Sequence, residues 1–473
     1  MMPFVFEWLW SDLLVWLLVA GAAVLVFYTR ARPHLRAPWT RVGRSASGMS
    51  AATVLALFVL IGLLDSVHYR EALPPQDGKV AYATEVRSLL DRVLLPLRAT
   101  REKTYSAPLA THLYAKETVQ SADGSETRVF PRLRYGGAHL ADAEADWAHD
   151  VSTRAFRGLA LALMLWLMAA VGLCAVRTRR TGAGMESAWR EIWQGQTQVP
   201  WRAVLCALGL LCVIIGPVMA LAPHYHVLGT DKVGQDVLYQ ALKSIRTGLV
   251  IGTLATMVML PFALVLGVMA GYFKGWVDDL IQYLYTTLSS IPGVLLIAAA
   301  VLMMQVYIEI NSALFPTTEI RADVRLLALC VILGVTSWTG LCRLLRGETL
   351  KLREMEYIQA AHAFGVSHWR IMMRHLMPNL MHIVMIALVM DFSGLVLAEA
   401  VLSYVGVGVD PSMISFGTMI NSARLEMARE PMVWWSLAAA FVFMLTLVLA
   451  ANLFADAVRD AFDPRLIVGG GRS

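Results

Sequence analysis

Ionisable side chains gather in residues 356–380, EYIQAAHAFGVSHWRIMMRHLMPNL, between two long apolar runs. Good helix formers fill residues 347–364, and Gly365 then interrupts them, because glycine suits the left-handed position just past a helix end. Ser367 is placed to cap a second short helix, and Pro378 is expected to mark the break before the next apolar run. The sequence therefore predicts two short helices joined by a sharp bend.

The predicted bend carries side chains suited to contact with a partner. Ala360 and Ala361 leave a flat patch that another backbone could approach closely, and apolar side chains nearby could serve as anchors. A protruding helix of this kind resembles the ligand of a groove on a second protein. An amphipathic connection lying on a membrane explains the same composition, so the residues alone leave both interpretations open. The apolar anchors are Tyr357, Ile358, Phe364 and Trp369.

Two common kinds of site are missing from the sequence. The phosphate loop G-x-x-x-x-G-K-[ST] does not occur, and the nearest glycine pair, GYFKGW, has the wrong spacing. The 5 cysteines lie in or beside apolar runs without metal-ligand spacing, which favours small buried hydrophobes over disulfides or a metal site. We therefore expect a non-catalytic chain that holds no cofactor or metal of its own.

The composition is that of a membrane protein. Of the 473 residues, 57% are hydrophobic and 16% are charged, against about 45–50% and about 25% in soluble domains. A helix needs about 20 mostly apolar residues to cross a bilayer. Nine runs are candidates: residues 8–28, 48–65, 156–176, 203–222, 246–271, 285–307, 325–342, 382–405 and 433–455.

Basic residues in the loops give the predicted orientation. Residues 28–45 and 177–194 are rich in arginine, and such short loops gather on the cytoplasmic side of a membrane. We interpret the net charge of +5 as a topology signal and not as a nucleic-acid surface. The N-terminus is therefore expected outside, and the C-terminus and residues 343–381 are expected in the cytoplasm.

Residues 66–155 are then expected to form an extracytoplasmic domain. Residues 80–99 have apolar positions at helical spacing, which predicts an amphipathic helix. Residues 116–135 predict a hairpin around Asp123-Gly124. The domain is interpreted either as a small packing domain or as a docking surface for an external partner.

Two carboxylates lie within an apolar run. Asp391 and Glu399 are eight residues apart, which places them on one face of a helix. Ionisable groups inside a membrane face a cavity or a partner, since an isolated charge there is costly. A role in the substrate path and a helix–helix hydrogen bond both fit this pattern.

The stretch at 356–380 resembles the EAA loop of ABC-transporter permeases, E-A-A-x3-G-x9-[I/H]-x-L-P. The spacing matches throughout, but Gln359 replaces the glutamate and Met377 replaces the leucine. In this family the loop forms a coupling helix that sits in a groove of a cytoplasmic ATPase. The resemblance thus implies an ATPase-coupling role for Tyr357, Gln359, Ala360, Ala361, Gly365 and Pro378.

Further segments resemble the dipeptide/oligopeptide branch of these permeases, the OppC/DppC type. HVLGTDKVGQDVLYQ is similar to the run G-T-D-x-x-G-R-D-V-L, with Gln235 in place of the arginine. VMAGYFKGWVDDLI is similar to G-Y-x-G-G-x-x-D, and FADAVRDAFDPRL to the closing G-D-x-L-R-D-x-L-D-P-R. These motifs occur in family order from about residue 177 to the C-terminus.

The resemblance implies an all-α polytopic membrane protein with a type I ABC-importer permease core of six transmembrane helices. About three extra spans and a small extracytoplasmic α+β domain precede that core. The expected domains are two N-terminal helices with a basic loop at 1–65, the extracytoplasmic domain at 66–155, a third helix with a cytoplasmic leader at 156–202, and the permease core at 203–473 with its EAA loop at 343–381.

The implied function is that of an inner-membrane permease subunit of an ATP-driven importer, with di- or oligopeptides as the expected substrate. The implied partners are a second permease (OppB/DppB-like), two ATP-binding subunits (OppD/OppF-like) and an extracytoplasmic solute-binding protein, within membrane lipid and without nucleic acid. Alternatives are an importer of nickel chelates or glutathione, a stand-alone secondary transporter, and a membrane sensor.

Overall fold

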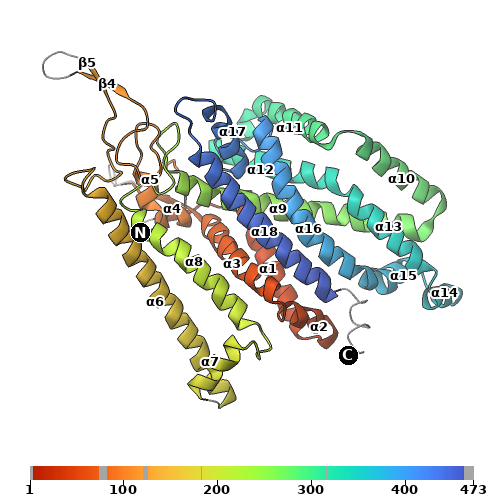
Figure 1. Cartoon of the computed structure of the whole chain (residues 1–473). Helices are drawn as coiled ribbons and strands as arrows, with labels where there is room; N and C mark the ends of the chain where they lie inside the picture. Colours follow the sequence, from red (N-terminus) through yellow and green to blue (C-terminus); the bar gives the residue numbers. More distant parts are fainter. Residues whose placement is uncertain (1–3, 74–81, 121–125, 183, 316, 463–473) are drawn as a thin grey trace. The chain divides into compact units, whose positions relative to one another are not determined.

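The computed structural model describes residues 4–73, 82–120, 126–182, 184–315 and 317–462. Within them the chain is mostly helical, and nine helical runs are long and apolar enough to cross a membrane. The predicted polytopic helical fold and its number of crossings are thereby confirmed for the described residues (Figure 1). These runs are α1 (Trp10–Arg30), α3 (Ala46–Asp65), α6 (Trp147–Thr181), α8 (Trp201–Leu221), α9 (Val237–Phe273), α11 (Gly293–Ile310), α12 (Thr318–Ser337) continuing into α13 (Thr339–Arg353), α15 (His368–Ile371) continuing through η2 (Met372–Leu376) into α16 (Met377–Val405), and α18 (Trp435–Phe462).

Shorter helices connect these runs. The crossing predicted at 285–307 is divided, because Pro292 separates two helices and holds Ile291 in an extended conformation. The shorter helices are α2 (Pro33–Val42), α4 (Leu89–Val93), α5 (Leu95–Ala99), α7 (Met185–Trp193), α10 (Gly275–Ser290), the 3-10 turn η1 (Ser312–Leu314), α14 (Glu356–Ala363) and α17 (Phe416–Glu426).

Two small antiparallel sheets provide the β structure of the described residues. The first has the order β1 (Phe4–Phe6), β2 (His68–Glu71), β3 (Arg87–Ser88). The second pairs β4 (Glu117–Gln120) with β5 (Glu126–Val129), in the register Glu117 opposite Val129. The predicted hairpin is therefore present, while its turn at Asp123-Gly124 lies outside the described residues.

The prediction of a single amphipathic helix over residues 80–99 is wrong. Residues 87–88 are extended, α4 begins after Ser88, and α5 follows Leu94. Two local signals override the helical spacing of the apolar side chains. Ser88 and Asp91 form a reciprocal capping box that starts a helix at Leu89, and Pro96 begins a second helix because it cannot continue the first.

The chain divides into two compact units that cut across the predicted domain boundaries. One unit contains Met1–Trp8, Gly43–Thr247 and Ile414–Ala450, and the other contains Leu9–Val42, Gly248–Met413 and Ala451–Ser473. The boundaries proposed at residues 65, 155 and 202 stay predictions, since packing groups the segments in another way.

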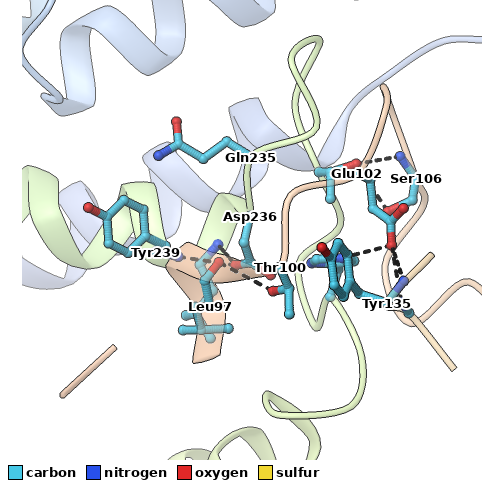
Figure 2. A network of polar contacts seen from close by, with 12 residues as sticks. Leu97, Thr100, Glu102, Ser106, Tyr135, Gln235, Asp236 and Tyr239 are labelled. Atoms are coloured by element: carbon cyan, nitrogen blue, oxygen red, sulfur yellow. Dashed lines mark hydrogen bonds and ion pairs between the residues drawn. The ribbon is translucent and has the colours of Figure 1, made fainter. Parts of the chain in front are cut away.

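In the first unit, a buried polar cluster joins the 66–155 segment to the residues before α9. Glu102 accepts hydrogen bonds from the backbone N–H groups of Arg134, Tyr135 and Gly136, at 2.7–3.1 Å (Figure 2). His226 Nε2 lies 3.5 Å from a Glu102 oxygen, and its Nδ1 lies 2.7 Å from Asp236. Burial alone would lower the pKa of His226, but these two carboxylates outweigh it and raise the pKa to about 9.

The same segment carries the G-T-D-x-x-G motif noted in the sequence. Gly234 has a φ of +74°, and a Cβ there would meet the Glu102 carbonyl oxygen at 1.8 Å, so only glycine fits this backbone approach. Asp236 accepts from the N–H groups of Leu238 and Tyr239 at the start of α9, as a helix cap does. Lys243 in α9 reaches the buried carboxylates of Asp65 and Asp91, at 2.7 and 3.1 Å.

In the second unit, two close helix contacts position the loop that follows α13. Gly267 and Gly271 of α9 are four residues apart, and a Cβ at either would strike the backbone of α13, as in the small-xxx-small packing of membrane helices. Arg346 of α13 forms a two-pronged ion pair with Asp278 of α10, at 2.6 and 2.8 Å. In the same unit, α1 packs against α12, where the Ser11 N–H donates to Asp323.

Candidate functional site

The candidate site is the chain between α13 and α16, which contains the EAA-like motif. Helix α14 lies at the tip where α13 and α15 meet (Figure 1). The helix predicted over residues 347–364 is divided, because Met355, between α13 and α14, has an extended backbone. Lys274 bonds the Glu354 carboxylate at 2.9 Å, and this hydrogen bond lowers the pKa of Glu354. Gln359 donates to the Glu354 carbonyl at 3.2 Å, so the motif residue stabilises the bend.

The turn after α14 follows the predicted chemistry. Gly365 has a φ of +72°. Its N–H donates to the His362 carbonyl, and the Val366 N–H donates to the Ala361 carbonyl, at 3.0 and 3.1 Å. This pair of bonds is the Schellman arrangement, which satisfies the last carbonyls of a helix. The left-handed glycine expected from the sequence is therefore present.

The predicted cap and break further along differ from the structure. Ser367 is the residue before α15, but its side chain makes no capping bond. Pro378 does not break the chain, because α15, η2 and α16 form one continuous run. In the π turn η2 the Met377 N–H bonds the Met372 carbonyl five residues back. This shift of register leaves Pro378 at the second position of α16, where its missing N–H is tolerated.

Exposure separates the residues that could meet a partner from those that hold the loop. The residues Phe364, Trp369 and Tyr357 are 87%, 65% and 42% exposed, and Ala360 is exposed as well. Ile358 is only 2% exposed and belongs to the core of its own unit. The prediction that Ile358 anchors a partner is therefore wrong, because this side chain is buried in the core of its own unit.

The remaining motif residues have structural contacts. Ala361 is half-buried against the same core, so the alanine pair does not form one flat exposed patch. The Tyr357 hydroxyl accepts from Asn379 at 3.1 Å, and Asn379 also donates to the His375 carbonyl at 2.7 Å. These bonds bring Tyr357 to the residue that follows Pro378.

The two carboxylates of α16 have different surroundings. Glu399 is 1% exposed and accepts from Ser403 at 2.6 Å, one turn along the same helix. Asp391 is half-buried. Eight residues at a rise of about 1.5 Å separate them by roughly 12 Å along the helix, so they do not act as one pair. The contact of Glu399 favours the structural interpretation for that residue.

Three residues that line the site were missed from the sequence. Arg353, His362 and His368 converge with Tyr272 at the end of α9, and the Tyr272 hydroxyl lies 2.8 Å from His368 Nδ1. The basic residues of the loop were noted only as topology signals. Their convergence depends on Tyr272, which is about a hundred residues away in the chain, so no local spacing could reveal it.

In the part of the chain that the structure describes, nine helical runs are long and apolar enough to cross a membrane. Residues 354–366, here called the hook, lie between two of these runs. Together they define a polytopic membrane protein with a projecting loop. The chain belongs to the family of binding-protein-dependent transport system inner membrane components, which matches residues 263–468. It is a multi-pass permease component of an ABC transporter, of the OppC/DppC branch. The family description implies a solute-binding protein and an ATPase as partners.

Curated relatives carry the same assignment. The oligopeptide transport system permease protein OppC of Mycobacterium tuberculosis is 34% identical over 239 residues, 50% of this chain and 76% of the relative. The glutathione transport system permease protein GsiD of Pectobacterium atrosepticum is 33% identical over 241 residues, 51% and 73% of the two chains. The dipeptide transport system permease protein DppC of Bacillus subtilis is 26% identical over 297 residues, 59% and 86% of the two chains.

Proposed function

We propose that this chain forms half of the translocation pore of an ATP-driven peptide importer and receives force through α14. The exposed hook carries the proposal. Phe364, Tyr357 and Ala360 face away from the core, while the Arg346–Asp278 pair fixes α13 behind them. An anchored helix that presents apolar side chains outward can enter a groove and transmit its movement to the attached spans.

The proposed orientation places the hook in the cytoplasm. The loop that contains the hook and the loop before α3 are both rich in basic residues, and the positive-inside rule assigns such loops to the cytoplasm. The N-terminus and residues 66–155 are then proposed to lie outside. The proposed assembly contains two ATP-binding subunits, a second permease and an extracytoplasmic solute-binding protein. This chain is proposed to contribute no catalytic group and no cofactor, with ATP bound by the partner subunits.

Di- or oligopeptides are the proposed substrates, because the oligopeptide and dipeptide permeases are among the relatives. Glutathione is the second candidate, since the relative from Pectobacterium atrosepticum is named for its transport. Uptake of a labelled dipeptide into vesicles that contain the whole transporter is measured with unlabelled dipeptide or with glutathione as competitor, which separates the two candidates. Uptake of the label that neither unlabelled solute reduces would contradict both substrate proposals.

An Ala360→Trp substitution tests the coupling role. A bulky side chain on the exposed face of α14 is expected to prevent seating of the hook, because small residues are what allow close approach. Transport is expected to fall at least tenfold, while the ATPase subunits keep their basal hydrolysis and the permease keeps its fold. Ala360 is a better position for this test than Ala361, since Ala361 packs against the core of its own chain.

The matched control is Ala145→Trp, which changes an exposed alanine of the 66–155 segment. Solute uptake and ATP hydrolysis are measured together in reconstituted vesicles. Normal transport by the Ala360→Trp variant would refute the coupling role of α14.

A further inference from the structure

A cavity of about 310 Å³ opens beside the hook. All of its lining belongs to one compact unit, and it joins the end of α9, the end of α13, α14 and the start of α15. The lining includes polar side chains from each of these elements. They are Tyr272, Arg353, Glu354, Gln359, His362 and His368.

The guanidinium of Arg353 presents a donor without an acceptor. Its Nη1 atom is buried and has no hydrogen-bond partner among the described residues, and its Cζ lies 6.0 Å from the centre of the Tyr272 ring. A buried donor left unpaired is destabilising, and more so when it belongs to a charged group. Because Arg353 also lines the cavity, an acceptor that enters it from outside this unit meets a guanidinium with an unused donor.

The charges around the cavity also favour an anion. The one carboxylate in the lining, Glu354, is already bound by Lys274 at 2.9 Å. His362 and His368 add two imidazoles whose ring centres are 5.4 Å apart. Arginine is suited to carboxylate recognition because its planar fork donates two parallel bonds. A carboxylate thus matches both the unpaired donor and the basic lining.

Gln359 accounts for the missing acceptor in this chain. The position lines the cavity, and the EAA pattern has a glutamate there. A glutamate would put a carboxylate of this chain into the same cavity lining as Arg353. The glutamine instead turns to the Glu354 carbonyl and adds no negative charge.

We propose that this cavity accepts an aspartate or glutamate side chain of the ATP-hydrolysing subunit, with Arg353 as its main ligand and His362 and His368 beside it. The inference rests on the proposed function and adds the chemistry of the contact. In this contact the permease supplies the positive charge and the ATPase supplies the carboxylate, which is the reverse of a contact in which the permease supplies the carboxylate. The partner is a protein because the cavity borders the exposed face of α14, where the hook is proposed to seat.

Zero-length crosslinking of the whole transporter tests the contact. An Arg353→Lys variant, co-expressed with its ATPase subunits and treated with a carbodiimide, is expected to form an amide between the introduced amine and a carboxylate of the ATPase. The carbodiimide takes up the water that is lost. Mass spectrometry locates the crosslink. The control is Arg370→Lys, an exposed position of the same loop outside the cavity lining, and wild type gives the background from Lys274 and Lys351.

Two further variants test whether Arg353 attracts a negative charge of the ATPase. Arg353→Met is expected to weaken retention of the ATPase about tenfold or more, as the loss of a charge-assisted hydrogen bond does. Gln359→Glu is also expected to weaken it, because the new carboxylate occupies Arg353. Stronger retention by Gln359→Glu, or unchanged retention by Arg353→Met without a crosslink in Arg353→Lys, would overturn the inference. Failure of the wild-type chain to retain any co-expressed ATPase would overturn the proposed function itself.

Discussion

At the scale of single residues, Gly365 decides the direction of the hook. Its φ of +72° lies in the region where side chains with a Cβ are strained, and nothing lies within 4 Å of the position a Cβ would occupy. Crowding is therefore not the constraint, and the backbone conformation is. The Schellman bonds at 362–366 depend on that conformation.

A Gly365→Ala substitution is expected to destabilise the turn by about 1–2 kcal/mol, the cost of the left-handed conformation for a residue with a Cβ. Hydrogen exchange of residues 356–371 should rise, and transport per ATP hydrolysed should fall. The control is Gly347→Ala, a helical glycine of α13 that also has open space around it, where alanine should be neutral or stabilising. Equal effects of the two substitutions would argue against a special role of the turn.

At the scale of elements, an ion pair links α10 and α13 behind the hook. Arg346 donates two short hydrogen bonds to the Asp278 carboxylate, and the Arg346 side chain is 25% exposed. Two-pronged pairs fix orientation as well as distance. A movement of the hook is thus expected to carry α13 and α10 together.

An Arg346→Lys substitution keeps the charge and removes the fork. It is expected to lower the free energy of unfolding by about 1.5 kcal/mol, near the low end for hydrogen bonds to charged groups because the pair is partly exposed. It is also expected to reduce the coupling of transport to ATP hydrolysis. Thermal melting in detergent and the ratio of transport to ATP hydrolysis measure the two effects. Arg343→Lys serves as the control, since Arg343 donates to Ser289 and lies over the Tyr285 ring but forms no ion pair among the described residues. If melting and coupling both match the wild type, the pair is not the connection we describe.

At the scale of the whole molecule, the 66–155 segment packs against the rest of its compact unit through buried contacts. Glu102 and His226 are 124 residues apart in the chain and are each buried. Burial alone would raise the pKa of Glu102, but His226 and three backbone N–H groups lower it to about 2. Both groups are therefore charged at neutral pH, and each stabilises the other.

The stability of this unit should depend on pH with a defined sign. The raised pKa of His226 means that its contribution is complete below about pH 6.5 and is lost as the pH rises through about 9. The lowered pKa of Glu102 means that its contribution is present above about pH 4.5 and is lost as the pH falls toward 2. Melting between pH 6 and 9.5 should therefore show a decline that the His226→Gln variant lacks.

His149→Gln, at an exposed histidine of α6, is the control for that experiment and should melt with the same pH dependence as the wild type. A His226→Gln variant that keeps the alkaline decline would show that another group titrates, and the ionised cluster would lose its assigned role.

The sequence by itself determined the features that depend on local pattern. The nine crossings follow from runs of apolar residues, the hairpin follows from alternation around a turn, and the bend follows from the conformational freedom of Gly365. The motif around Ala360 could be recognised for the same reason, since its residues are neighbours in the chain. Each of these signals is complete within about twenty residues.

Only the tertiary structure decided which side chains face inward and which distant groups meet. Ile358 is buried because α14 packs on its own unit, Pro378 is accommodated by the π turn before it, and α1 packs against α12. The cavity around Arg353 depends on Tyr272, and the cluster of Glu102, His226 and Asp236 joins segments more than a hundred residues apart. Such contacts result from packing between elements, and no local periodicity encodes which elements will meet.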